Sequence, residues 1–121
     1  MVDEEGVQNR DRDRAQQRGT HQLAPVELVT VDQLLDTLDR EKAAPFICKI
    51  DIEGGEANLF RCNYAWLERF PLVIIELHDW LLPGEGNSRN FLKAALEFDF
   101  DFVYRGENLF CFNNALLKEY A

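Results

Sequence analysis

Carboxylate and imidazole side chains follow two apolar stretches of this chain, and these side chains can hold or transfer a proton. Asp51 and Glu53 lie at the end of the first stretch, and Glu76 and His78 lie at the end of the second. Groups of this kind can orient a hydroxyl group and accept its proton. Since an acid at the end of a buried strand is costly to desolvate, its presence calls for a reason. These four residues are therefore the candidate site.

Two predicted strands must position these side chains. Residues 46–52 are mostly apolar and rich in β-branched residues, which is typical of a strand buried on both faces in a parallel sheet. Gly54 and Gly55 then allow a sharp turn, and the apolar spacing from Glu56 predicts a helix to about residue 69. Residues 72–77 predict a second buried strand, parallel to the first through a right-handed crossover. Ligands bind at the carboxyl ends of such strands.

Each candidate also has a structural interpretation. Asp51 and Glu53 could orient a hydroxyl group, take its proton or hold a positive charge, but Glu53 could instead cap the following helix. Glu56 is expected to cap rather than to catalyse. Glu76 and His78 are two residues apart, so their side chains point the same way. With Asp51 they could form an acid/base pair or a metal site; we favour a His78 hydrogen-bonded to a neighbouring acid and predict no metal.

The remaining segments complete an α/β pattern. Residues 26–31 are β-prone, and Asp32 is a plausible N-cap for a helix to about residue 38. We expect residues 26–31 to form a strand beside residues 46–52, joined to it by a βαβ crossover through this helix. Asn87 or Ser88 can cap a helix to about residue 97. Two runs near the C-terminus, residues 99–104 and 109–112, predict an antiparallel hairpin.

The loop between the second predicted strand and the helix that ends near residue 97 carries further candidates. Trp80, with the two leucines that follow it, could form an apolar lid over a bound molecule or pack against another part of the protein. The segment 84–86, Gly-Glu-Gly, lacks a third glycine and carries an acid that would repel phosphate. It is best interpreted as a plain connection.

Composition excludes several classes. With 22 acidic and 13 basic residues the net charge is −9, and no basic patch suggests a nucleic-acid partner. No apolar run approaches the roughly 20 residues of a membrane helix. The 3 cysteines lack metal-ligand or disulfide spacing, which favours a reduced, cytoplasmic setting. Residues 1–24 are polar and predict a disordered tail, and residues 25–121 carry the domain.

The segment 49–56, Lys-Ile-Asp-Ile-Glu-Gly-Gly-Glu, resembles the signature of the FkbM-type methyltransferases, Lys-Ile-Asp-Val-Glu-Gly-x-Glu. Residues 29–35 are similar to the family's apolar-Thr-Leu-Asp-x-Leu-Leu segment. Residues 72–78 are similar to its next strand, which ends in Glu-apolar-His. The resemblance covers roughly residues 26–113, and Cys62 stands where the family has a glycine.

This resemblance implies an enzyme of the Rossmann-like class that transfers a methyl group from S-adenosylmethionine to a hydroxyl of a sugar or another small molecule. On this reading Asp51, Glu53 and His78 are catalytic and Asp51 and Gly54 contact the cofactor. The acceptor contacts are Glu76, His78 and Trp80.

The family's glycine-rich cofactor turn, Asp-x-Gly-Ala-Asn-x-Gly, is absent from the sequence. We therefore expect the C-terminal part of a Rossmann-like methyltransferase sheet, with parallel strands and a terminal antiparallel hairpin, in a truncated chain. The alternative is a catalytically inactive remnant that acts as an interaction or assembly module. In either case we expect self-association through the exposed sheet edge.

Overall fold

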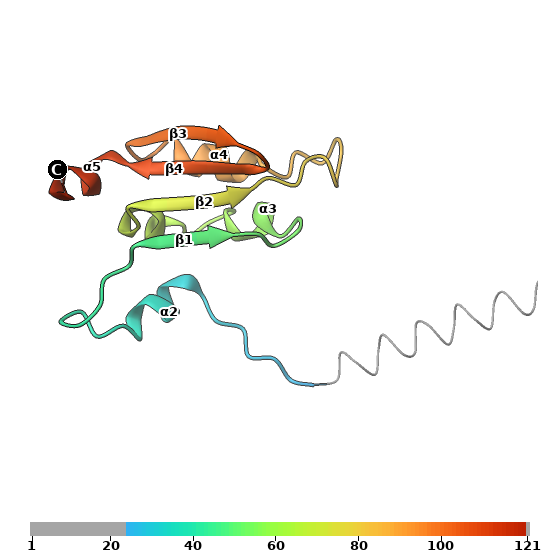
Figure 1. The fold of residues 1–121 in the computed structure, drawn as a ribbon. Helices are drawn as coiled ribbons and strands as arrows, with labels where there is room; N and C mark the ends of the chain where they lie inside the picture. Colours follow the sequence, from blue (N-terminus) through green and yellow to red (C-terminus); the bar gives the residue numbers. More distant parts are fainter. Residues whose placement is uncertain (1–23, 121) are drawn as a thin grey trace, which may run out of the picture. The chain divides into compact units, whose positions relative to one another are not determined.

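Four strands form one mixed sheet in the computed structural model, which describes residues 24–120 (Figure 1). They are β1 (Ile47–Ile50), β2 (Leu72–Glu76), β3 (Phe100–Arg105) and β4 (Asn108–Asn113), and they lie in the order β1-β2-β4-β3. β1 and β2 are parallel, whereas β4 is antiparallel to both of its neighbours, β2 and β3. The predicted α/β class, the parallel pair and the terminal hairpin are confirmed.

Short helices connect these strands. The α-helices are α2 (Val31–Asp36), α3 (Glu56–Leu59), α4 (Arg89–Ala95) and α5 (Asn114–Leu117), and the 3₁₀ helices are η1 (Ala65–Arg69) and η2 (Lys118–Tyr120). Within residues 24–120, none of the helices is long and apolar enough to cross a membrane. The tail predicted for residues 1–24 lies almost entirely outside the described residues.

The N-terminal strand prediction is wrong. Residues 25–30 have no regular secondary structure, and Val26 and Leu28 are exposed. A β-prone run becomes a strand only where a neighbouring strand takes its backbone hydrogen bonds, and no strand pairs with this segment among the described residues. Helix α2 already begins at Val31, so Asp32 lies in its first turn rather than at the N-cap.

The single helix predicted from Glu56 to about residue 69 is also wrong. Helix α3 ends at Leu59, and Asn63 has φ +56°, a left-handed conformation that an α-helix cannot contain. The chain resumes as the 3₁₀ helix η1, in which Trp66 and Leu67 are buried. The apolar spacing therefore predicted correctly that these side chains are buried, but it was wrong in predicting one continuous helix.

The core lies against one face of the sheet. Val73 and Ile75 of β2 pair with Cys111 and Leu109 of β4, and all four are buried. They belong to one cluster of apolar side chains with residues from the connecting helices, among them Phe60, Leu67, Phe91, Ala94 and Ala95. Alternating burial along β2 and β4 is typical of strands that are covered on one face.

Strand β1 does not fit the prediction of burial on both faces. Only Ile50 of this strand is buried, and Ile47 is 52% exposed. Among the described residues β1 is an edge strand with β2 as its neighbour, so its other edge is unpaired.

Two contacts fix the segment that leads from β2 into α4. Asp79 accepts hydrogen bonds from the backbone N–H and the hydroxyl of Ser88, and so closes the loop between them. Ser88 precedes α4 as predicted, but its side chain makes no capping hydrogen bond. Asn90 of α4 donates to the carbonyl of Ala57 in α3 at 2.7 Å. The loops after β1 and β2 are thereby held together.

Candidate functional site

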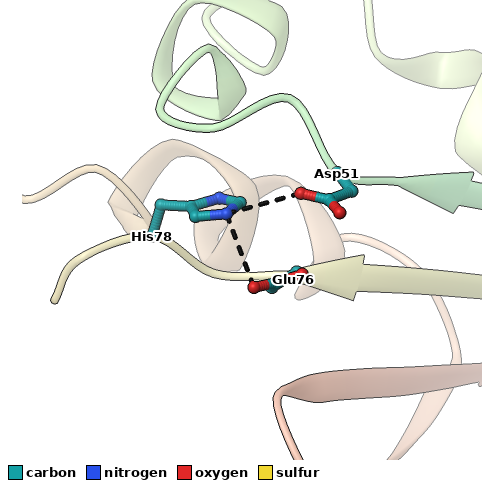
Figure 2. Close-up of side chains that lie close together, drawn as sticks. All are labelled: Asp51, Glu76 and His78. Atoms are coloured by element: carbon teal, nitrogen blue, oxygen red, sulfur yellow. Dashed lines mark ion pairs between the residues drawn. The ribbon is translucent and has the colours of Figure 1, made fainter. Parts of the chain in front are cut away.

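The register of the parallel pair brings the candidate side chains to one place. Ile50 of β1 pairs with Ile75 of β2, so Asp51 and Glu76 follow at the same level of the sheet. His78 lies two residues beyond Glu76. Figure 2 shows the His78 ring directed at both carboxylates, with Nε2 3.4 Å from Oδ1 of Asp51 and 3.6 Å from Oε1 of Glu76. The predicted meeting of these three residues at the carboxyl ends of the strands is confirmed.

A buried carboxylate fixes the orientation of His78. Glu56, the first residue of α3, is fully buried, and its Oε1 lies 2.8 Å from Nδ1 of His78. Its Oε2 accepts from Nδ2 of Asn87 at 2.8 Å and from the backbone N–H of Gly54 at 3.0 Å. The backbone N–H of Ile52 makes a longer contact to Oε1, 3.4 Å.

These contacts determine the charge of Glu56. Burial alone would raise its pKa, but the backbone hydrogen bonds and those from Asn87 and His78 outweigh burial and lower the pKa below the ordinary value. Glu56 is therefore ionised, and it accepts a hydrogen bond from Nδ1 of His78, which carries the proton. In neutral His78, this leaves the lone pair on Nε2, on the side of Asp51 and Glu76.

His78 responds to the same partners. Burial opposes its charged form, yet the hydrogen bond to Glu56 and the negative charges around it raise the pKa of the imidazole. The pKa of Glu76 is also raised, by burial first and then by the charge of Asp51. The pocket therefore concentrates negative charge around one imidazole.

Six residues line a pocket of about 230 Å³ at this point: Asp51, Glu53, Glu76, His78, Trp80 and Leu81. Trp80 is mostly exposed, and its ring centroid lies 6.1 Å from that of His78. It also lines an adjoining pocket of about 230 Å³ with Leu77, Tyr104, Gly106 and Glu107. A larger hollow of about 630 Å³ near η1 and α5 contains none of the candidate residues.

The turn after β1 departs from the expectation for Glu53. This residue has φ +49°, and the N-cap of α3 is Gly55, which has no side chain to make a capping hydrogen bond. Glu53 therefore does not cap the helix; its side chain lines the pocket instead. Gly54 has φ +105°, and a Cβ at this position would lie 2.9 Å from Cδ1 of Leu82. Both its conformation and its surroundings require glycine.

Sequence reasoning missed the roles of Glu56 and Asn87. Both were interpreted as helix caps. Instead both are buried, and the Asn87 amide donates a hydrogen bond to Oε2 of Glu56. A signal was present in the spacing, because an acid two residues after Gly54 can reach back to the N–H groups of its own turn. No local pattern indicated that Asn87 would complete the network.

The comparisons with known proteins gave one finding. A family model described as "Methyltransferase FkbM domain" matches residues 3–105. The searches of curated proteins and of solved structures returned no match.

Proposed function

Because the chain belongs to the FkbM methyltransferase family, we propose that it takes part in methyl transfer to a hydroxyl group of a sugar or another small metabolite. One observation carries this proposal. Nε2 of His78 and the carboxylates of Asp51 and Glu76 converge on a pocket at the carboxyl ends of two parallel strands. Ligands of open α/β sheets bind in this position.

In the proposed arrangement the acceptor hydroxyl enters the acidic pocket. Asp51, Glu53 and His78 are the groups that can hold its proton or take it, which makes the oxygen a better nucleophile. Glu76 and His78 orient the hydroxyl, and this positioning is the main contribution that a protein makes to an in-line displacement.

The rest of the acceptor would lie against Trp80. This side chain lines both the acidic pocket and the adjoining pocket, where Tyr104 offers a second exposed aromatic ring. Flat aromatic surfaces beside a hydrogen-bonding pocket suit a ring that is apolar on its face and polar at its edge, as a sugar is.

Members of the family use S-adenosylmethionine as the source of the methyl group. The described residues offer only part of a site for it. The pocket of about 230 Å³ is smaller than the roughly 300–1,000 Å³ of ordinary cofactor sites. The sequence also lacks the family's glycine-rich turn, although Asp51 and Gly54 remain candidates for contact with the cofactor.

We therefore predict that the 121-residue chain binds S-adenosylmethionine more weakly than micromolar. Isothermal titration calorimetry on the chain measures this directly. A saturable micromolar site would contradict the prediction and would mean that the described residues need no further contacts. We propose that the described sheet is the acceptor-side part of a Rossmann-like methyltransferase.

Methyl transfer is tested with the chain at millimolar S-adenosylmethionine, which compensates for weak binding, and a panel of sugars and hydroxylated metabolites. We expect a methylated product by mass spectrometry and its loss in Asp51→Asn. Asp36→Asn, a matched change at an exposed position of α2, should leave the yield unchanged. Absence of product with every acceptor, or equal product from Asp51→Asn, would refute the function.

A second candidate function is assembly without catalysis. It is favoured by the unpaired edge of β1, where Phe46 and Ile47 are about half exposed. A second copy of the chain could pair with this edge, because identical strands readily extend a sheet. Light scattering after size-exclusion chromatography should then show a dimer that Ile47→Lys converts to a monomer. A wild-type monomer would rule this candidate out.

A further inference from the structure

Asp51, Glu76 and His78 form a group whose side chains could together bind a metal ion. Each offers one ligand atom, and the three atoms lie within 4.8 Å of one another. We propose that they bind a divalent cation of the Mn²⁺ and Mg²⁺ class. This assignment replaces our expectation from the sequence that these residues bind no metal.

The position of His78 distinguishes this group from an ordinary acidic cluster. Its side chain is only 3% exposed, and Nδ1 is bound to the buried Glu56. Nε2 faces Asp51 and Glu76 at 3.4 and 3.6 Å, which is longer than the roughly 2.7–2.9 Å of a charge-assisted hydrogen bond. A buried nitrogen is thus aimed at two carboxylates without hydrogen-bonding to either.

Glu56 has the relation to His78 that carboxylates have in known metal sites. A ligating histidine commonly donates its second N–H to a carboxylate, which fixes the ring and makes the ligating nitrogen more basic. Here Glu56 is itself held by Asn87 and by the backbone N–H of Gly54. The imidazole is therefore oriented before any ligand arrives.

The spacing of the ligand atoms suits one small cation. Around an octahedral ion, two adjacent ligands that each lie about 2.1 Å from the ion are about 3.0 Å from each other. The distances from Nε2 to Asp51 and Glu76 are 3.4 and 3.6 Å. A cation could therefore contact all three side chains once the carboxylates of Asp51 and Glu76 move slightly toward Nε2.

The local charge also favours a cation. Asp51, Glu53 and Glu76 line the pocket, and Glu56 lies behind His78. No lysine or arginine among the described residues forms an ion pair with any of these four acids. Two of the three ligands are carboxylates, and carboxylate oxygens suit Mg²⁺ and Mn²⁺.

The link to catalysis rests on the proposed function. A cation held by three side chains would keep open positions for an acceptor oxygen, and Glu53, which is not one of the three, would remain to take the proton. Cation binding itself needs neither cofactor nor acceptor. It can therefore be tested separately from methyl transfer.

The test is a titration of the full chain with Mn²⁺, in which electron paramagnetic resonance measures the free ion. We expect one saturable site per chain and displacement of Mn²⁺ by excess Mg²⁺. Asp51→Asn and Glu76→Gln should each weaken binding at least tenfold. Glu56→Gln should weaken it about 10–100-fold although Glu56 is not a ligand, because it positions His78.

Asp36→Asn is the matched control and should bind as the wild type does. Circular dichroism confirms that each variant is folded before its affinity is compared. The proposal is overturned if no saturable binding occurs below millimolar Mn²⁺. It is equally overturned if Asp51→Asn and Glu76→Gln bind as tightly as the wild type. Loss of methyl transfer with intact Mn²⁺ binding would refute only the proposed function.

Discussion

Replacement of Glu56 by glutamine tests whether one buried carboxylate organises the site. The substitution keeps the volume of the side chain and removes its charge. Three good hydrogen bonds then change from charge-assisted to neutral: those from His78 and Asn87 at 2.8 Å and that from Gly54 at 3.0 Å. Hydrogen bonds to charged groups are worth about 1.5–3 kcal/mol and neutral ones about 0.5–1.5 kcal/mol, so we expect a loss of about 3 kcal/mol in the free energy of unfolding.

The same substitution should change the tautomer of His78. In place of Oε2, the new amide nitrogen would face two donors, the Asn87 amide and the Gly54 N–H. In place of Oε1 it would face the more distant N–H of Ile52, at 3.4 Å, and Nδ1 of His78, which can become an acceptor by moving its proton to Nε2. The second orientation costs less, and it removes the lone pair from the pocket.

Urea unfolding followed by the fluorescence of the buried Trp66 measures the stability. Glu53→Gln is the matched control, because it makes the same change in the same turn at an exposed side chain, and it should stay within about 0.5 kcal/mol of the wild type. Nitrogen chemical shifts of His78 report the tautomer. A Glu56→Gln variant as stable as Glu53→Gln, or one with Nε2 still unprotonated, would refute this reasoning.

Two further predictions concern the turn and the core. Gly54→Ala should destabilise the chain by about 2–3 kcal/mol in urea unfolding, because the new Cβ combines a positive φ with a contact to Leu82. Gly84→Ala is the control: Gly84 has φ +85° but open surroundings, and its replacement should cost about 1 kcal/mol. Equal losses of stability in the two variants would contradict the steric argument. Burial raises the pKa of Cys111 to about 12, so in the native chain at pH 8 a thiol reagent should modify the exposed Cys62 quickly and Cys111 only on unfolding. Rapid modification of both would show that the core opens.

Patterns that depend on near neighbours were predictable from the sequence. The apolar run that ends at Asp51, the glycine turn and the second run that ends at Glu76 indicated a parallel pair, and the register of β1 and β2 confirms it. The terminal hairpin followed from two β-prone runs and a short turn. Parallel strands bring their carboxyl ends together, so the meeting of Asp51, Glu76 and His78 also followed.

Features that depend on distant partners were not predictable. The break after α3 comes from the left-handed conformation of Asn63, which the apolar spacing does not reveal. The exposure of β1 depends on which strand lies beside it. Glu56 is the clearest case, because its partners His78 and Asn87 lie 22 and 31 residues away. A glutamate is rarely buried without partners, and the local sequence does not indicate which residues those partners are.

The spacing of the acidic motif has a geometric reason in this fold. Asp51 leaves β1 beside Glu76, and the left-handed Glu53 and Gly54 then reverse the chain. The reversal brings Glu56 back to the N–H groups of its own turn, while its oxygens also bind His78 and Asn87 from the segment after β2. One carboxylate thus joins the ends of two parallel strands and directs the imidazole into the pocket. Stability and cation binding should consequently both fall in Glu56→Gln. In Asp51→Asn cation binding alone should fall, because the Asp51 side chain is partly exposed and its contact to His78 is long, 3.4 Å.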